Sequence, residues 1–385
     1  MTFVPSFVIL LSVALGACGG SSGGDSAEPP DDPNTLGPLA VGHIQFTEVD
    51  AARGDRPILV DAWYPADEAD AEDRPLARYP LAGPIALESV IAKDDPKVRS
   101  DAAWPLLIYS HGYQGVNLAA TDLMEALASH GFVVLAPEHT GNAQASPTDS
   151  FDEAAANRVP DVSFLIDQML ARSQDAGDRF HERIDESRIG VLGHSFGGMT
   201  AIGMAAGWAG APADPRVRAI APMSAVIDGK LQSDEREGPN AGFTEAQLNS
   251  ITVPVMLMGG TEDINVPIEN NAIAYAQIVN APRVLAVDII GATHNHFAAI
   301  CKIGDLLIEN GFDQDAWPLL GAEDLVEPYE TTCGPDVFPI EEASRLINLY
   351  SIAFFRRYLL DEAGYDQYFT DPFVDTEPAI EVTSK

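Results

Sequence analysis

Basic residues are scarce in this chain of 385 residues. It has 22 Lys and Arg against 58 Asp and Glu, so its formal net charge is −36 at pH 7. A surface with this charge repels the phosphates of nucleic acids and anionic lipid headgroups, which argues against either as a partner and disfavours highly anionic substrates. Hydrophobic residues make up 46% of the chain, which is enough for one large core or two smaller ones.

Cysteine is also rare, and the first of three copies is Cys18. It ends the stretch LGAC, which follows an apolar run too short to span a bilayer comfortably. This pattern resembles a bacterial lipobox, so we expect residues 1–17 to be a lipoprotein signal peptide and Cys18 to carry the lipid. No Lys or Arg precedes the apolar run, and plain secretion or a retained anchor are the alternatives.

Residues 19–34 consist mostly of Gly, Ser, Asp and Pro. Such a stretch cannot build a core and is typical of a flexible tether. We therefore assign residues 18–39 to a lipidated cysteine and linker, and residues 40–385 to one folded domain on the periplasmic or cell-surface side of a bacterial membrane. In an exported protein the two remaining cysteines, Cys301 and Cys333, are expected to form a disulfide.

Apolar runs suited to strands recur along the folded part. They lie near residues 41–49, 57–64, 104–110, 132–136, 188–192, 216–221, 253–258 and 283–290. Several of them, such as WPLLIYS and FVVLAP, are continuously apolar, as strands buried on both faces are. Stretches with helical spacing of apolar residues lie at 117–130, 152–171 and 341–360.

This alternation predicts an α/β fold with a mostly parallel sheet of eight strands flanked by helices. Two polar segments, residues 223–250 and 302–340, interrupt the rhythm after strands near the expected site. They are either cap elements over a pocket or surface insertions.

The most informative stretch is RIGVLGHSFGG at residues 188–198. A short apolar strand leads into G-x-S-x-G, and small residues suited to a helix follow. This is the context of a nucleophile elbow, in which a sharp turn exposes a serine hydroxyl above the end of a parallel sheet. The pattern predicts that Ser195 is a nucleophile. The alternative is a Gly-rich turn with an idle serine.

A serine hydroxyl needs a base, and the base needs a third group to orient it. Six histidines lie before the serine, beside it or in ordinary elements: His43, His111, His130, His139, His181 and His194. The loop GATHNHF holds the other two. We favour His294 as the base because a tight exit from the last strand precedes it. His296 is the alternative base, or else a hydrogen-bonded wall residue.

The acid is expected directly after the preceding strand, VPVMLMGG. Asp263 stands there in a G-x-x-D-x-x-x-P turn, and Glu262 is its competitor. Asp288 lies within the last strand and is better interpreted as structural. Two backbone N–H groups should hold the oxyanion. We expect them from Phe196, directly after the nucleophile, and from Tyr113, in the turn that follows the strand PLLIYS.

Together these stretches resemble the alpha/beta-hydrolase superfamily over nearly all of residues 40–362. More narrowly, they resemble bacterial dienelactone-hydrolase-like proteins related to platelet-activating factor acetylhydrolase. The matching stretches are YSHGYQG, SHGFVVLAPEHTGN, RVPDVSFLIDQML, RIGVLGHSFGG, GGTEDINVP and GATHNHFAAIC. The resemblance implies a serine ester hydrolase with Ser195, Asp263 and His294 in the triad positions.

The chain is also similar to cutinase-like polyester hydrolases through its His-Gly-Tyr and Gly-Ala-x-His turns. Those enzymes commonly carry an aromatic clamp residue after the strand that follows the elbow, whereas this chain has APMSAV at residues 221–226. True dienelactone hydrolases use a cysteine nucleophile, so the serine here makes that activity unexpected.

The expected function is therefore hydrolysis of small, medium or lipid-like carboxylic esters through an acyl-enzyme. The alternatives are polyester hydrolysis, peptidase or acyltransferase action at the same site, and a surface-tethered binding protein with a decayed site. No H-E-x-x-H, P-loop or EF-hand pattern occurs, so no metal or cofactor is expected. The expected partner is a small-molecule or polymeric ester, and the oligomeric state is left open.

Overall fold

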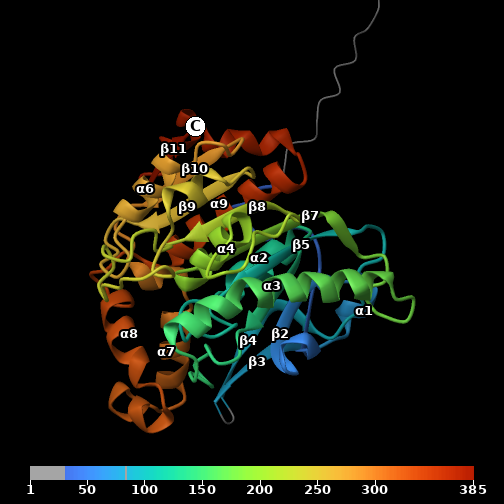
Figure 1. The fold of residues 1–385 in the computed structure, drawn as a ribbon. Helices are drawn as coiled ribbons and strands as arrows, with labels where there is room; N and C mark the ends of the chain where they lie inside the picture. The colour runs from blue at the N-terminus through green and yellow to red at the C-terminus, as the bar shows by residue number, and fades with distance from the viewer. Residues whose placement is uncertain (1–30, 83–84) are drawn as a thin grey trace, which may run out of the picture.

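A computed structural model describes residues 31–82 and 85–385 of the chain (Figure 1). The expected signal peptide and the predicted lipidation of Cys18 lie outside the described residues.

One sheet of eleven strands runs through the molecule in the order β11-β10-β9-β8-β7-β5-β6-β2-β1-β4-β3. In chain order the strands are β1 (Val41–Asp50), β2 (Arg56–Pro65), β3 (Leu76–Ala82), β4 (Ile85–Asp94), β5 (Trp104–Ser110), β6 (Val133–Glu138), β7 (Ile184–His194), β8 (Val217–Met223), β9 (Val255–Gly260), β10 (Val284–Ile289) and β11 (Ile380–Ser384). The six strands from β10 to β6 are mutually parallel, and β2 and β11 flank them in antiparallel pairing.

The expectation of eight strands was wrong, although each of the eight predicted runs forms a strand. The additional strands are β3, β4 and β11. In β4, buried residues alternate with exposed ones, and in β11 only Ile380 is buried. Strands near the edge of a sheet bury alternate side chains at most, so they lack the continuous apolar run that identifies central strands.

Helices cover both faces of the sheet (Figure 1). They are α1 (Glu68–Glu72), α2 (Thr121–Ser129), α3 (Phe151–Gln174), α4 (Phe196–Ala206), α5 (Glu245–Asn249), α6 (Glu269–Gln277), α7 (Ile300–Glu309), α8 (Val326–Thr332), α9 (Ile340–Leu359) and α10 (Asp371–Val374). Helices α2 and α9 pack into one hydrophobic core cluster, and α3, α4 and α6 pack into the other. The three helical stretches predicted from sequence correspond to α2, α3 and α9.

The two polar segments have different structures. Residues 302–340 form most of α7, two short 3-10 helices and α8, around a small cluster that buries Trp317, Leu307 and Leu325 with Ile85 of β4. A Cys301–Cys333 disulfide closes this helical segment, which lies at the lower left of Figure 1. Residues 223–250 remain largely irregular and contribute to the candidate site described below.

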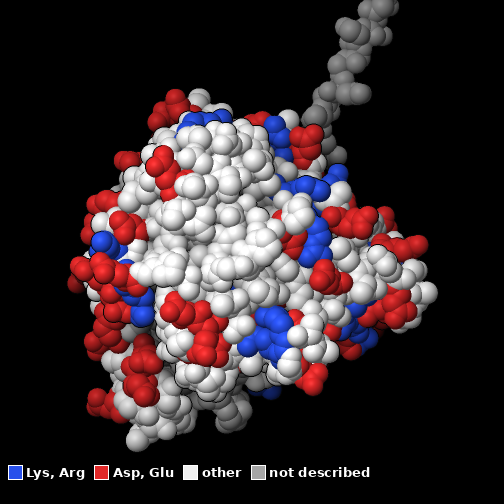
Figure 2. All heavy atoms as spheres, viewed as in Figure 1, with Lys and Arg blue, Asp and Glu red and all other residues white. Residues whose placement is uncertain are grey.

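Acidic side chains are spread around the visible face of the molecule, and a broad uncharged area lies at its centre (Figure 2). The negative charge is therefore dispersed there rather than gathered into one acidic patch. In the part of the chain that the structure describes, no helix combines the length and apolar character needed to cross a membrane.

Candidate active site

Ser195 stands at a sharp turn between β7 and α4. Its backbone has φ 57° and ψ −118°, a conformation that residues other than glycine rarely adopt. Its N–H donates to the carbonyl of Met223 at 2.8 Å. A Cβ at Gly197 would lie 1.7 Å from the carbonyl oxygen of Ser110, and one at Gly193 would lie 2.5 Å from that same oxygen. Both glycines are therefore required for the close packing of this turn against β5.

Asp263 and His294 meet at the carboxyl ends of the neighbouring strands β9 and β10. His294 Nδ1 and Asp263 Oδ2 are 2.8 Å apart. The second carboxylate oxygen accepts the N–H groups of Asn265 at 3.0 Å and Val266 at 2.7 Å. The Asp263 side chain is 1% exposed. This carboxylate fixes the proton of neutral His294 on Nδ1, which leaves Nε2 able to accept a proton.

Ser195 and His294 line the same cavity, which has a volume of about 260 Å³. No hydrogen bond joins the Ser195 hydroxyl to His294 within the described ranges; in sites without substrate this contact is often long. The irregular segment 223–250 supplies several other walls of the cavity: Val226, Gln232, Ser233, Asp234, Arg236 and Ala241. This segment therefore borders the site, whereas no residue of 302–340 lines the cavity.

Tyr113 and Phe196, the expected oxyanion donors, also line the cavity. Their rings meet edge to face with centroids 5.3 Å apart. Phe151, at the start of α3, adds a third ring 5.2 Å from Phe196. Sequence reasoning missed Phe151. The signal that could have found it is the Ser150-x-x-Glu153 capping box, which marks the first turn of α3.

Both ring nitrogens of His296 form hydrogen bonds outside the cavity. Its Nδ1 accepts the N–H of Thr293 at 2.9 Å, and its Nε2 donates to the carbonyl of Phe338 at 2.8 Å. The residue is buried, and burial lowers its pKa. With no nitrogen free for Ser195, His296 fits the wall role and His294 fits the base.

The competing carboxylates lie apart from this arrangement. Glu262 is exposed. Asp288 lies within β10, where Asn271 contacts it at 3.4 Å and burial raises its pKa to about 6. Neither lines the cavity that holds Ser195. The described residues also contain no cluster of three or more His, Cys, Asp or Glu side chains arranged to hold a metal ion.

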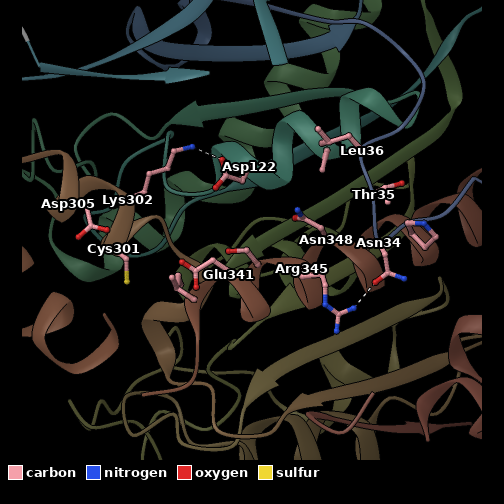
Figure 3. Close-up of a pocket in the computed structure, with 14 residues that line it drawn as sticks. Asn34, Thr35, Leu36, Asp122, Cys301, Lys302, Asp305, Glu341, Arg345 and Asn348 are labelled. Carbon is pink, nitrogen blue, oxygen red and sulfur yellow. Dashed lines mark hydrogen bonds and ion pairs between the residues drawn. The ribbon is translucent and has the colours of Figure 1, made fainter. Parts of the chain in front are cut away.

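A second cavity of about 510 Å³ lies between residues 33–36, α2, α7 and α9 (Figure 3). Lys302 contacts Asp122 across it at 2.6 Å, and Arg345 donates to Asn34 at 2.6 Å. Ser195 and His294 are absent from its lining. Since its cations already have polar partners and no histidine lines it to activate a hydroxyl, this cavity is not the candidate active site.

Comparison with known proteins finds several hydrolases similar to this chain. A family model described as Chlorophyllase matches residues 94–272, which include Ser195 and Asp263. Cutinase est1 of Thermobifida alba is 26% identical over 197 residues, covering 51% of this chain and 55% of that protein. A platelet-activating factor acetylhydrolase of Bos taurus is 27% identical, covering 27% of this chain and 32% of that protein.

The chain thus spans about half the length of the cutinase that it matches. Among solved structures, a ferulic acid esterase from Streptomyces cinnamoneus superposes with a TM-score of 0.62 and 22% identity, covering 91% of this chain and 97% of that one. The sheet order, the elbow and this superposition show that the chain has an alpha/beta-hydrolase fold. Its relatives include cutinases and a platelet-activating factor acetylhydrolase.

Proposed function

We propose that this protein is a serine carboxylic-ester hydrolase. The observation that carries the proposal is one cavity lined by a serine in a strained elbow and by a histidine held by a buried aspartate. A nucleophile, a base and an orienting acid in this relation are what acyl transfer requires.

In the proposed reaction His294 Nε2 takes the proton of the Ser195 hydroxyl as its oxygen attacks the ester carbonyl. The N–H groups of Phe196 and Tyr113 stabilise the tetrahedral oxyanion. Its collapse breaks the bond to the alcohol, which leaves with the proton from His294. Water then repeats these steps on the acyl-enzyme, while Asp263 stabilises the charged imidazole.

The size of the cavity favours small or medium acyl groups. At about 260 Å³ it lies just below the roughly 300–1,000 Å³ typical of sites for drug-sized ligands. Polyester hydrolysis is a second candidate, favoured by the similarity to cutinases and by the rings of Tyr113 and Phe151 in the wall. Those rings would take the place of the clamp residue that residues 221–226 lack.

The test is hydrolysis of p-nitrophenyl esters from acetate to palmitate by the full chain and its variants. Ser195→Ala and His294→Ala should abolish turnover, and His296→Ala should retain it if the protein folds. Asp263→Asn should lower kcat by about 10⁴-fold, because an amide cannot hold the required tautomer. Loss of activity in a folded His296→Ala protein, with His294→Ala still active, would transfer the base role to His296.

The same variants separate the alternatives. Turnover of amide substrates or transfer to an added alcohol in place of ester hydrolysis would indicate a peptidase or an acyltransferase. An insoluble aromatic polyester tests the second candidate. A fluorophosphonate that fails to label Ser195, with no turnover of any ester, would indicate a binding role.

We also propose that the chain is exported and anchored through Cys18. The LGAC motif supports this, as does the Cys301–Cys333 disulfide, because disulfides persist in oxidising compartments. In a bacterial host, labelled palmitate should enter the full chain and not its Cys18→Ser variant. Equal labelling of both, or recovery of the unmodified wild type from the medium, would contradict the anchor.

A further inference from the structure

Arg158 is a completely buried cation beside the candidate active site, and the mechanism above does not use it. It lies on α3 and is 0% exposed. Its guanidinium donates to Ser110 Oγ at 3.0 Å, the His111 carbonyl at 2.5 Å, the Gly112 carbonyl at 2.9 Å and Asn142 Oδ1 at 2.6 Å. In the described part of the chain no carboxylate lies within ion-pair distance of it. Four oxygen acceptors therefore hydrogen-bond this charge, and Asp161, beyond ion-pair distance, adds a Coulombic stabilisation.

The acceptors are concentrated on the turn that leads to Tyr113. The Gly112 carbonyl accepts from Arg158 and also from His111 Nδ1 at 2.7 Å, so its direction is fixed from two sides. The described chain has no cis peptide bond. In a trans peptide the C=O and the following N–H point in opposite directions. The N–H of Tyr113 consequently points away from Arg158.

This turn also lies beside the nucleophile. A Cβ on Gly112 would lie 3.6 Å from the Cβ of Ser195, and Tyr113 lines the cavity. The guanidinium also lies 4.8 Å from the centroid of the Phe196 ring, which lines the same cavity. A charge-assisted bond to a carbonyl polarises that peptide and strengthens its N–H as a donor.

A buried hydrogen-bond network holds the guanidinium in place. His139 Nε2 contacts Ser110 Oγ at 3.0 Å, and His139 Nδ1 contacts Asp161 at 2.9 Å. Asp161 in turn accepts from Arg56 at 2.9 Å. Burial lowers the pKa of Arg158 to about 9, which leaves it protonated at neutral pH. Burying a cation destabilises the folded state, so we infer that Arg158 has a role other than packing.

We propose that Arg158 is a positioning residue that orients and polarises the Gly112–Tyr113 peptide, so that the Tyr113 N–H meets the oxyanion of the reaction. The proposal rests on the proposed function of Ser195. It assigns to Arg158 an effect on the transition state and almost none on the binding of the ester, whose uncharged carbonyl gains less from the donor.

The variants are Arg158→Gln and the conservative Arg158→Lys, which keeps the charge but not the planar fork. Arg172→Gln is the matched control. It lies on the same helix, binds Glu48 and stacks on Phe46, far from the cavity residues. Thermal melting shows which variants fold. If Arg158→Gln does not fold, Arg158→Lys is the variant that tests the proposal.

With a p-nitrophenyl ester, Arg158→Gln should lose about 10²–10³-fold in kcat, the loss typical of one oxyanion donor, with KM within about twofold. Arg158→Lys should lose less, and Arg172→Gln should keep the wild-type kcat. If folded Arg158 variants lower stability but keep the wild-type kcat, the residue is structural and the proposal is wrong.

A second readout does not depend on turnover. Selective ¹⁵N-tyrosine labelling gives the amide signal of Tyr113, assigned through Tyr113→Phe. This signal should move upfield in Arg158→Lys and stay in place in Arg172→Gln. If wild type lacks Ser195-dependent turnover but the signal moves, the esterase proposal fails while the orientation of the peptide by Arg158 stands. An unmoved signal overturns the role of Arg158.

Discussion

Replacing Ser195 with glycine should make the protein more stable than replacing it with alanine. At φ 57° and ψ −118°, a residue with a Cβ is strained. Such strain costs about 1–3 kcal/mol, whereas glycine adopts this conformation freely. Glycine also gives the unfolded chain more freedom, which costs about 0.4–1 kcal/mol. The Ser195→Gly variant should therefore exceed Ser195→Ala by about 0.5–2 kcal/mol in the free energy of unfolding.

The comparison isolates the backbone because both substitutions remove the hydroxyl. In the described structure that hydroxyl makes no hydrogen bond, so its loss contributes little to either variant. Urea unfolding followed by circular dichroism gives both free energies, and fluorophosphonate labelling should be lost in both. At an unstrained position the glycine variant would be less stable by up to about 1 kcal/mol. That result would refute the idea that the elbow stores strain at the nucleophile.

Three further predictions concern the disulfide, a buried histidine and a glycine of the elbow. Removing the disulfide with Cys301→Ser and Cys333→Ser should cost about 3–4 kcal/mol, since the bond spans 32 residues, and equal urea midpoints would contradict this. Burial lowers the pKa of His139 to about 4, so on acidification the unfolded chain binds a proton at this residue before the folded chain does. The free energy of unfolding should therefore be at its full value above about pH 6.5 and fall by up to about 3 kcal/mol towards pH 4. In His139→Gln this fall with pH should be smaller. Gly197→Ala would place its Cβ 1.7 Å from a carbonyl of β5 and should cost more than about 3 kcal/mol, whereas exposed Gly177→Ala should not; urea unfolding compares them.

The central strands and the elbow could be predicted from sequence for a physical reason. Strands buried on both faces must be continuously apolar, so the runs of β5, β7 and β9 stand out. The glycines at 193 and 197 can likewise be recognised in the sequence as part of an elbow, because only glycine permits the close approach of the two backbones. Strands β3, β4 and β11, which lie at the edges of the sheet or next to one, leave a weaker pattern because part of each faces solvent.

The sequence by itself determined which residue types were available for the chemistry: a serine in an elbow, an aspartate after one strand and two histidines after the next. The preference for His294 over His296 as the proposed base rests on the tertiary structure alone, because it depends on which ring nitrogens neighbouring groups occupy. The same holds for Arg158 and Phe151. A buried arginine has no periodic pattern, and its role comes from carbonyls on a turn more than 40 residues away along the chain. Contacts between distant segments form only when the sheet brings them together.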